Sequence, residues 1–266
     1  MIANTIFVKN FYDMKLIKYG LTLQRVREED IEMLRQWRNS DYVREKMEYR
    51  EYITPEMQKK WFKSIDNPNN FYYIIIYKNE KIGLINEKGY DRYGNQKSES
   101  GLFLKSKEYE NTFAPVLASL ILIEMNFYFL NGKESYIRIL KDNLKSISYN
   151  KSIGYELCEN QENIENQLYV LTRESFERKT KKIRKAALRI SGNDPYFYLI
   201  WEPLDFESGI AQNSERIVKD YPIEIPSKFE NGCRIYYYKT DVDNMEIISS
   251  DVDVATPEDY YQDPKK

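Results

Sequence analysis

One apolar segment, Val116–Leu130, limits most strongly the folds that this chain can adopt. It falls short of the roughly 20 apolar residues that cross a bilayer, and it contains Glu124 and Asn126. A helix that is apolar on every side must be covered by other elements. The segment therefore predicts a buried central helix in a layered domain and no membrane span.

The segments around this helix alternate between strand-forming and helix-forming patterns. Branched and aromatic residues predict strands, whereas apolar residues spaced three apart, with caps at the ends, predict helices. The predicted elements are a strand at Thr22–Gln24, helices from Ile31 and from Pro55 (capped by Thr54), a hairpin of Phe71–Tyr77 and Lys81–Asn86, a strand at Glu99–Leu104, the buried helix, a strand at Ser135–Leu140, a helix from Asn143 to Gly154, and a strand at Gln167–Leu171. This order, β-α-α-β-β-β-α-β-α-β, predicts an α/β (α+β) domain.

The C-terminal part of the chain differs from the rest in charge. Residues 190–266 contain 7 basic and 16 acidic residues, a formal charge of −9, whereas residues 1–189 carry +7. Such asymmetry predicts a separate module or tail. We expect a main domain at 1–188 that includes a basic helix through Arg178–Lys185, a small α+β extension at 189–250, and an acidic mobile tail at 251–266.

Several pieces of the extension suggest structure. Tyr196–Trp201 and Arg234–Tyr238 are β-rich, and Gln212–Lys219 has a helical pattern. The basic helix could touch nucleic acid or neutralise the extension, but a solvated helix face explains it as well. We therefore expect no nucleic-acid partner.

The residue types that are rare or absent restrict the chemistry. The chain has no histidine and only two cysteines, Cys158 and Cys233. This excludes Ser-His and Cys-His nucleophile systems and argues against a disulfide framework or a metal cluster. Met1–Gly20 shows no secretory signal of the usual layout. We expect a cytoplasmic protein, with no metal and no membrane partner, whose acid-base chemistry uses carboxylates, tyrosine, lysine or water.

Three segments carry a resemblance to a known family. Met33–Met47 (MLRQWRNSDYVREKM) contains a Trp-Arg-Asn turn, and Leu140–Tyr155 contains Asn-x-x-Ser-Ile-x-x-Asn-x-x-x-Gly-Tyr. Gly101–Leu104, a polar loop and the apolar helix follow one another. Over about Thr22–Leu171 these segments resemble the GNAT N-acetyltransferases, nearest to nucleotide-sugar and ribosomal-protein acetyltransferases. The resemblance implies a GNAT fold with a mixed, mostly antiparallel sheet flanked by helices.

The resemblance also implies acetyl-CoA as co-substrate. Family members bind its pantetheine arm along a strand and its pyrophosphate at the following loop and helix; the matching positions here are Leu102, Phe103, Leu104, Asn111, Thr112, Phe113, Ala114 and Asn143. The family loop is rich in glycine, whereas Glu110–Pro115 contains none, and Pro115 lacks an N–H. Coenzyme binding would therefore use fewer amides, helped by the Thr112 hydroxyl and the Asn111 amide. For Asn143, a plain helix N-cap is an equally good explanation.

Three residues are candidates for catalysis. The tyrosine with which family members protonate the departing thiolate is replaced by Asn150. Because a thiol has a pKa near 8.5, coenzyme A can leave as thiolate with modest help, and a hydrogen bond from Asn150 could provide some of it. A carboxylate or a water chain must take the proton of the acceptor amine. Glu99, on the predicted coenzyme-facing strand, is the first candidate and Glu87 the second. An exposed surface carboxylate remains the alternative for both.

The acceptor side is predicted at Trp37, Arg38 and Asn39. Trp37 has the helical spacing of a core residue, whereas Arg38 and Asn39 could bind an anionic acceptor such as a nucleotide diphosphate. A helix C-terminal arginine placed favourably by the dipole is the alternative. We predict direct acetyl transfer, with no covalent enzyme intermediate, to a primary amine and preferably to an amino-sugar nucleotide.

Two other functions remain open. A non-catalytic GNAT-like module would bind an acyl-CoA or a protein, and the glycine-free loop and Asn150 favour it. A protein N-acetyltransferase would act on a protein N-terminus or a lysine, which the acidic extension could attract. A homodimer and a protein partner bound through the acidic C-terminal region also remain open.

Overall fold

The computed structural model describes residues 15–67, 69–89, 97–130, 132–192, 194–201, 227–230, 233–240 and 247–248. The described strands are β1 (Lys15–Lys18), β2 (Leu21–Arg25), β3 (Phe71–Tyr77), β4 (Glu80–Lys88), β5 (Lys97–Leu104), β6 (Glu134–Leu140), β7 (Glu156–Leu157), β8 (Asn166–Thr172), β9 (Tyr196–Trp201), β10 (Ser227–Glu230), β11 (Cys233–Thr240) and β12 (Ile247–Ile248). The helices are α1 (Ile31–Asn39), α2 (Asp41–Arg44), α3 (Pro55–Ile65), α4 (Ala114–Glu124), α5 (Leu144–Ile153) and α6 (Arg173–Ile190), with short turns η1 (Glu28–Asp30), η2 (Lys107–Tyr109) and the π-helical η3 (Met125–Phe129).

The strands form one mixed sheet in the order β10-β11-β9-β1-β2-β3-β4-β5-β6-β8-β7, with β12 paired to β11. Among the described strands, β5 and β6 are the parallel pair and the other neighbours are antiparallel. A parallel pair needs a crossover connection, and here α4 supplies it. The predicted α/β fold, with a mostly antiparallel sheet flanked by helices, is confirmed.

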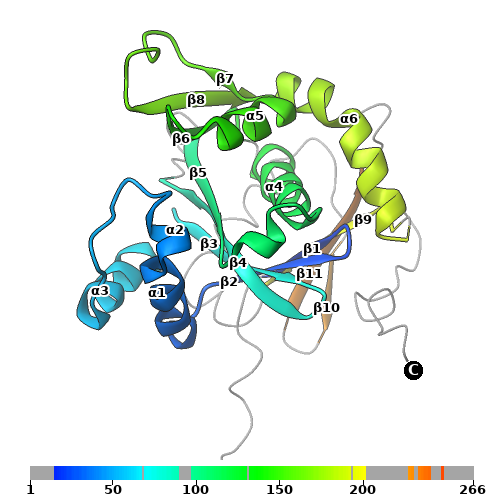
Figure 1. Ribbon diagram of the computed structural model, residues 1–266. Helices are drawn as coiled ribbons and strands as arrows, with labels where there is room; N and C mark the ends of the chain where they lie inside the picture. Colours follow the sequence, from blue (N-terminus) through cyan, green and yellow to red (C-terminus); the bar gives the residue numbers. More distant parts are fainter. Residues whose placement is uncertain are drawn as a thin grey trace, which may run out of the picture.

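The apolar segment forms α4 and η3, and it is buried as predicted. The sheet curves around α4, while α1, α2 and α3 lie on its other face (Figure 1). Residues 117–128 of this helix are all buried, so no side of it is left for polar residues to face water. The main core lies between α4 and the concave face of the sheet, and a smaller core lies under α1 and α3.

Local signals fix the ends of the helices near the site. The Thr54 hydroxyl accepts a hydrogen bond from the Met57 amide and Pro55 opens α3, as the sequence predicts. Asn143 caps α5 by accepting from the Ser146 amide, and Gly154 ends it with φ of +112°, a conformation that favours glycine. The described helices include none that is long and apolar enough to cross a membrane.

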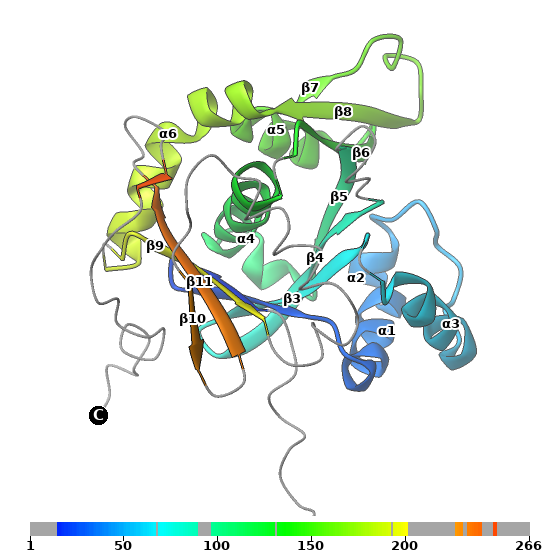
Figure 2. The ribbon, with the colours of Figure 1, turned by 180° about the vertical axis from the view of Figure 1, so that it is seen from behind.

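The C-terminal strands continue the sheet. β9 pairs with β1 and β11 pairs with β9, so these segments extend the sheet beyond the chain's first described strand (Figure 2). The predicted strands at 196–201 and 234–238 are present. The predicted helix at 212–219 and the tail at 251–266 lie outside the described residues, and the boundaries at 188 and 250 stay predictions.

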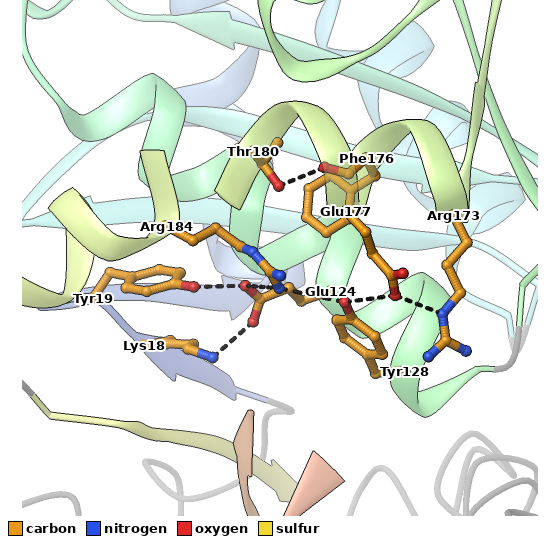
Figure 3. Close-up of polar contacts among 9 residues, drawn as sticks. All are labelled: Lys18, Tyr19, Glu124, Tyr128, Arg173, Phe176, Glu177, Thr180 and Arg184. Atoms are coloured by element: carbon orange, nitrogen blue, oxygen red, sulfur yellow. Dashed lines mark hydrogen bonds and ion pairs between the residues drawn. The ribbon is translucent and has the colours of Figure 1, made fainter. Parts of the chain in front are cut away.

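A buried ionic cluster joins β1, α4 and α6. Glu124 accepts hydrogen bonds from Lys18 Nζ at 2.8 Å and Tyr19 OH at 2.6 Å, and Arg184 Nη1 lies 3.5 Å from its carboxylate (Figure 3). The Lys18, Glu124 and Arg184 side chains are at most 1% exposed. The Tyr128 hydroxyl accepts from Arg184 at 3.3 Å. Removing one charge from such a cluster leaves the remaining buried charges less well compensated, which is costly.

This cluster also explains what the sequence analysis missed. Lys15–Lys18 has charged residues at both ends and was not predicted as a strand, but Glu124 compensates the burial of Lys18. In α6, Phe176, Thr180 and Ala187 are buried, and Arg184 of the basic run is buried with them instead of facing solvent. Part of the basic run is thus a core feature.

Candidate functional site

The two parallel strands β5 and β6 part halfway along their length. Their pairing runs from Lys97 with Glu134 to Ser100 with Ile137, although β5 continues to Leu104 and β6 to Leu140. On its other side β5 remains paired with β4 up to Leu104. In the described part of the chain, no strand pairs with the edge of residues 101–104 that faces β6. Backbone groups there can bind an extended ligand as an added strand would.

Residues of this open edge point alternately to the two faces of the sheet. Leu102 and Leu104 pack towards the main core around α4, whereas Phe103 packs with the smaller core under α1 and α3. A methyl group on Gly83 would lie 2.3 Å from the Phe103 carbonyl oxygen, so β4 and β5 approach closely here. The predicted pantetheine-binding residues thus form a strand end that is paired with β4 on one edge and with no described strand on the other.

The loop after β5 has few backbone donors to offer. The Thr112 hydroxyl donates to the Tyr109 carbonyl and accepts from the Ala114 amide, and Pro115 has no N–H. The predicted role of Thr112 in holding a phosphate therefore competes with two internal hydrogen bonds. Asn111 and Phe113 are exposed. The phosphate-binding capacity expected of a helix N-terminus is thus reduced in this loop.

Glu110, in the same loop, gathers three donors from separate elements. Its Oε1 atom accepts from Tyr42 OH at 2.6 Å and from Lys46 Nζ at 2.6 Å, and its Oε2 atom accepts from Lys145 Nζ. Burial tends to raise the pKa of Glu110, but hydrogen bonds from Lys145, Lys46 and Tyr42 lower it to about 2. The carboxylate is therefore ionised at neutral pH. Both lysines lie within segments that carry the family resemblance, but at positions to which it assigns no role.

The two candidate proton acceptors lie on opposite faces of the sheet. Glu99 is 29% exposed, and its carboxylate lies 2.6 Å from Lys88 Nζ and 3.4 Å from Arg138 Nε. Glu99 and Phe103 alternate in phase along β5, so both face the α1 side. Gly101, between them, leaves room for the Asn86 side chain, whose Oδ1 would lie 3.1 Å from an added methyl group.

Glu87 is a buried carboxyl and not a surface one. It is 1% exposed and accepts a hydrogen bond from the Ser98 hydroxyl, while its Oε2 atom has no hydrogen-bond partner among the described residues. Burial raises the pKa of Glu87 to about 8, because the ionised form would lose its hydration. The alternative of an exposed strand-end glutamate is wrong for this residue. A substrate amine has no direct access to it.

A chain of hydroxyl groups lies beside Glu87. Tyr155 OH is 3.0 Å from Ser135 Oγ, which is 3.0 Å from Ser100 Oγ. Burial raises the pKa of Tyr155 above its ordinary value. Ser100 belongs to the last rung at which β5 and β6 still pair. The point where the strands part is thus lined by neutral hydroxyls on its α4 side.

Helix α5 places Asn150 and Tyr149 on different sides. The Asn150 amide donates to the Ser146 carbonyl at 2.9 Å, so one of its donors is used within the helix. The Tyr149 hydroxyl donates to the Pro115 carbonyl at 3.0 Å and lies 2.8 Å from Ser119 Oγ, so this ring is directed to α4. The thiolate-protonating role predicted for Asn150 would require its remaining donor.

Of the three residues predicted for the acceptor, Arg38 has a buried donor without a hydrogen-bond partner among the described residues. Asn39 donates to the Ile53 carbonyl at 2.9 Å and accepts from the Ile53 amide at 2.8 Å, which fixes the loop before α3. Trp37 packs in the smaller core. Arg38 is half-buried, its guanidinium carbon lies 6.0 Å from the centre of the Phe103 ring, and its Nη1 atom has no hydrogen-bond partner among the described residues. Burial lowers the pKa of Arg38, because the charged form loses hydration.

Comparison with known proteins agrees with this arrangement. Residues 23–168, more than half of the chain, match the family described as "Acetyltransferase (GNAT) domain". The chain belongs to the GNAT acetyltransferase family. Among curated proteins, no sequence matches this GNAT chain. In the described residues, no group of three or more His, Cys, Asp or Glu side chains could hold a metal ion.

Several solved GNAT structures share the fold. The apo structure of FdhC, a nucleotide-linked sugar GNAT, is 21% identical, covers 67% of this chain and 97% of its own, and has a TM-score of 0.53. The aminoglycoside acetyltransferase AAC(6')-Ib in complex with coenzyme A is 18% identical, covering 59% and 98%, with a TM-score of 0.51. A chimera of the spermidine N-acetyltransferase SpeG from Vibrio cholerae is 16% identical, covering 59% and 98%, with a TM-score of 0.51.

Proposed function

We propose that this protein transfers an acetyl group from acetyl-CoA directly to a primary amine. The observation that carries the proposal is the unpaired edge of Gly101–Leu104 on β5, at the point where β5 and β6 part. The chain continues from β5 to α4 and from β6 to α5. An extended pantetheine arm can pair with such an edge as an added strand would. Structural relatives bound to coenzyme A or acetyl-CoA support the same ligand.

An amino-sugar nucleotide is the acceptor that we favour. Arg38 supports it, because a half-buried guanidinium with an unused donor is stabilised by an anionic group of a ligand. The likeness to a nucleotide-linked sugar GNAT points the same way. Aminoglycosides and spermidine, named for other relatives, are cationic and would gain nothing from Arg38. A protein acceptor, a homodimer, a protein partner and a cytoplasmic location stay predictions.

Glu99 is our choice for the group that takes the proton of the amine. It is accessible, and it lies one residue before the last rung of the β5–β6 pairing. Transfer forms the N–C bond as the C–S bond breaks; the amine proton passes to Glu99 and coenzyme A leaves as thiolate. Glu87 is buried and lacks such access. We assign to Asn150 the weaker role of one hydrogen bond to the departing sulfur.

The experiment is a thiol-release assay with acetyl-CoA and a panel of amines, namely an amino-sugar nucleotide, an aminoglycoside, spermidine and a lysine peptide. Glu99→Gln should lower kcat/KM about 100-fold or more, with the KM for acetyl-CoA little changed. Arg38→Ala should raise the KM of an anionic acceptor about tenfold and leave that of spermidine unchanged. The control is Glu165→Gln, which changes an exposed carboxylate in the loop just before β8.

Binding of acetyl-CoA is measured in parallel by calorimetry. Binding without thiol release from any amine would favour the second candidate, a non-catalytic acyl-CoA-binding module, for which the shortage of loop amides is the specific observation. No heat at millimolar ligand would contradict both functions. A Glu99→Gln variant with full activity would exclude Glu99 as the proton acceptor.

A further inference from the structure

The loops that follow β5 and β6 meet at an ionic cluster. Parallel neighbouring strands place their carboxyl ends at one edge of a sheet, and ligands of open α/β sheets bind outside such ends. Glu110 lies in the loop after β5, and Lys145 lies in the first turn of α5, after β6. Lys46, just beyond α2, reaches the same carboxylate. The cluster thus joins three elements at the open end of the parting strands.

The charges of this cluster do not balance. Two lysines share one carboxylate, and their side chains are 43% and 65% exposed while that of Glu110 is 16% exposed. Their mutual repulsion favours a second negative charge beside them. Because the ammonium groups are the exposed partners, an anion from solvent can reach them without opening the core.

The surroundings of the cluster suit a nucleotide. Phe113 is 57% exposed at the start of α4, and Leu144 is 73% exposed at the start of α5. Apolar side chains beside cations can cover the base of a nucleotide while the cations hold its phosphates. The nearby backbone contributes little, since the Ala114 amide is used by Thr112 and Pro115 has none. Side chains must therefore supply most of any phosphate binding here.

We propose that Lys46 and Lys145 hold the diphosphate of coenzyme A, and that Glu110 is a resident anion that the diphosphate displaces. The proposal rests on the proposed function, since it concerns the same ligand. A diphosphate carries more negative charge than one carboxylate, so both lysines bind it in preference to Glu110. The displaced carboxylate then opposes the ligand, and binding is weaker than the two lysines alone would give.

The experiment is calorimetric titration of coenzyme A into the full chain and four variants. Lys46→Ala and Lys145→Ala should each weaken binding about tenfold, and Glu110→Gln should tighten it about fivefold. Lys151→Ala, another exposed lysine of α5, should leave it unchanged. Circular dichroism confirms that each variant folds. The same variants are titrated with S-acetylpantetheine, which lacks the diphosphate and should bind all of them alike, and with uridine diphosphate.

The outcomes separate this inference from the proposed function. No binding of coenzyme A to the unaltered chain would overturn both. If the unaltered chain binds coenzyme A and the Lys46→Ala and Lys145→Ala variants bind it as tightly as Lys151→Ala does, the role of the two lysines is overturned. The proposed function is then left intact. Weakened binding of uridine diphosphate alone would assign the lysines to an acceptor and overturn the assignment to coenzyme A. Weaker binding by Glu110→Gln would show that Glu110 positions the lysines and would overturn its displacement.

Discussion

Replacing Glu87 by glutamine should change how the stability of the protein depends on pH. The carboxyl is 1% exposed and its pKa is about 8, against about 4.5 in the unfolded chain. Between these two values the folded state keeps a proton that the unfolded state has lost. The stabilisation from Glu87 is therefore complete below about pH 4.5 and is lost as pH rises through about 8.

The size of the effect follows from the pKa difference. One pKa unit corresponds to about 1.4 kcal/mol, so the free energy of unfolding should lose about 3 to 5 kcal/mol from this group between pH 5 and pH 9. Glutamine has nearly the same shape and does not titrate. Glu87→Gln should thus match the unaltered chain near pH 5 and exceed its stability by about 3 to 5 kcal/mol near pH 9.

Urea unfolding followed by circular dichroism at pH 5, 7 and 9 measures this difference directly. Glu165→Gln is the matched control, because that carboxylate is 64% exposed and paired with an exposed Lys141. Its difference from the unaltered chain should stay within about 0.5 kcal/mol at each pH. If the Glu87→Gln difference is equally flat, the carboxyl is not held neutral by burial and the reasoning fails.

Two further substitutions test the framework of the fold. Lys18→Met leaves Glu124 partly uncompensated and should lower the free energy of unfolding in urea by about 3 to 5 kcal/mol. Lys141→Met, which changes an exposed pair, should lower it by under about 0.5 kcal/mol. Equal losses in the two variants would contradict the role of the buried cluster. Gly154→Ala places a side chain at φ of +112°, 3.0 Å from the Ser175 carbonyl oxygen, and should cost roughly 1 to 3 kcal/mol. An unchanged melting temperature would show that the turn relaxes freely.

The order of elements could be predicted because each signal lies within one short segment. Thr54-Pro55 marks the start of α3, and the apolar run from Val116 marks a buried helix, without reference to the rest of the chain. β1 could not be predicted this way. Its Lys18 is buried only because Glu124, distant in sequence, compensates the charge.

The candidate site also contains residues that could be predicted from the sequence and residues that could not. Gly101–Leu104 and Asn143 could be placed, because strand, loop and helix follow one another in the sequence. The contact of Lys46, Glu110 and Lys145 could not, since tertiary packing alone brings three distant segments together. Asn39 is the reverse case, because its motif suggested ligand binding while the structure uses both ends of its amide on Ile53.

The pairing of β1 with β9 has a consequence for how the chain is made. Residues 15–17 leave the ribosome long before their partners, residues 198–200. Until then one side of β1 is a bare strand edge, which invites pairing with other chains. A product that stops after α6 would keep that edge permanently, so we expect the acetyltransferase region alone to aggregate where the longer chain stays monodisperse. Segments synthesised after α6 thus protect the edge of β1.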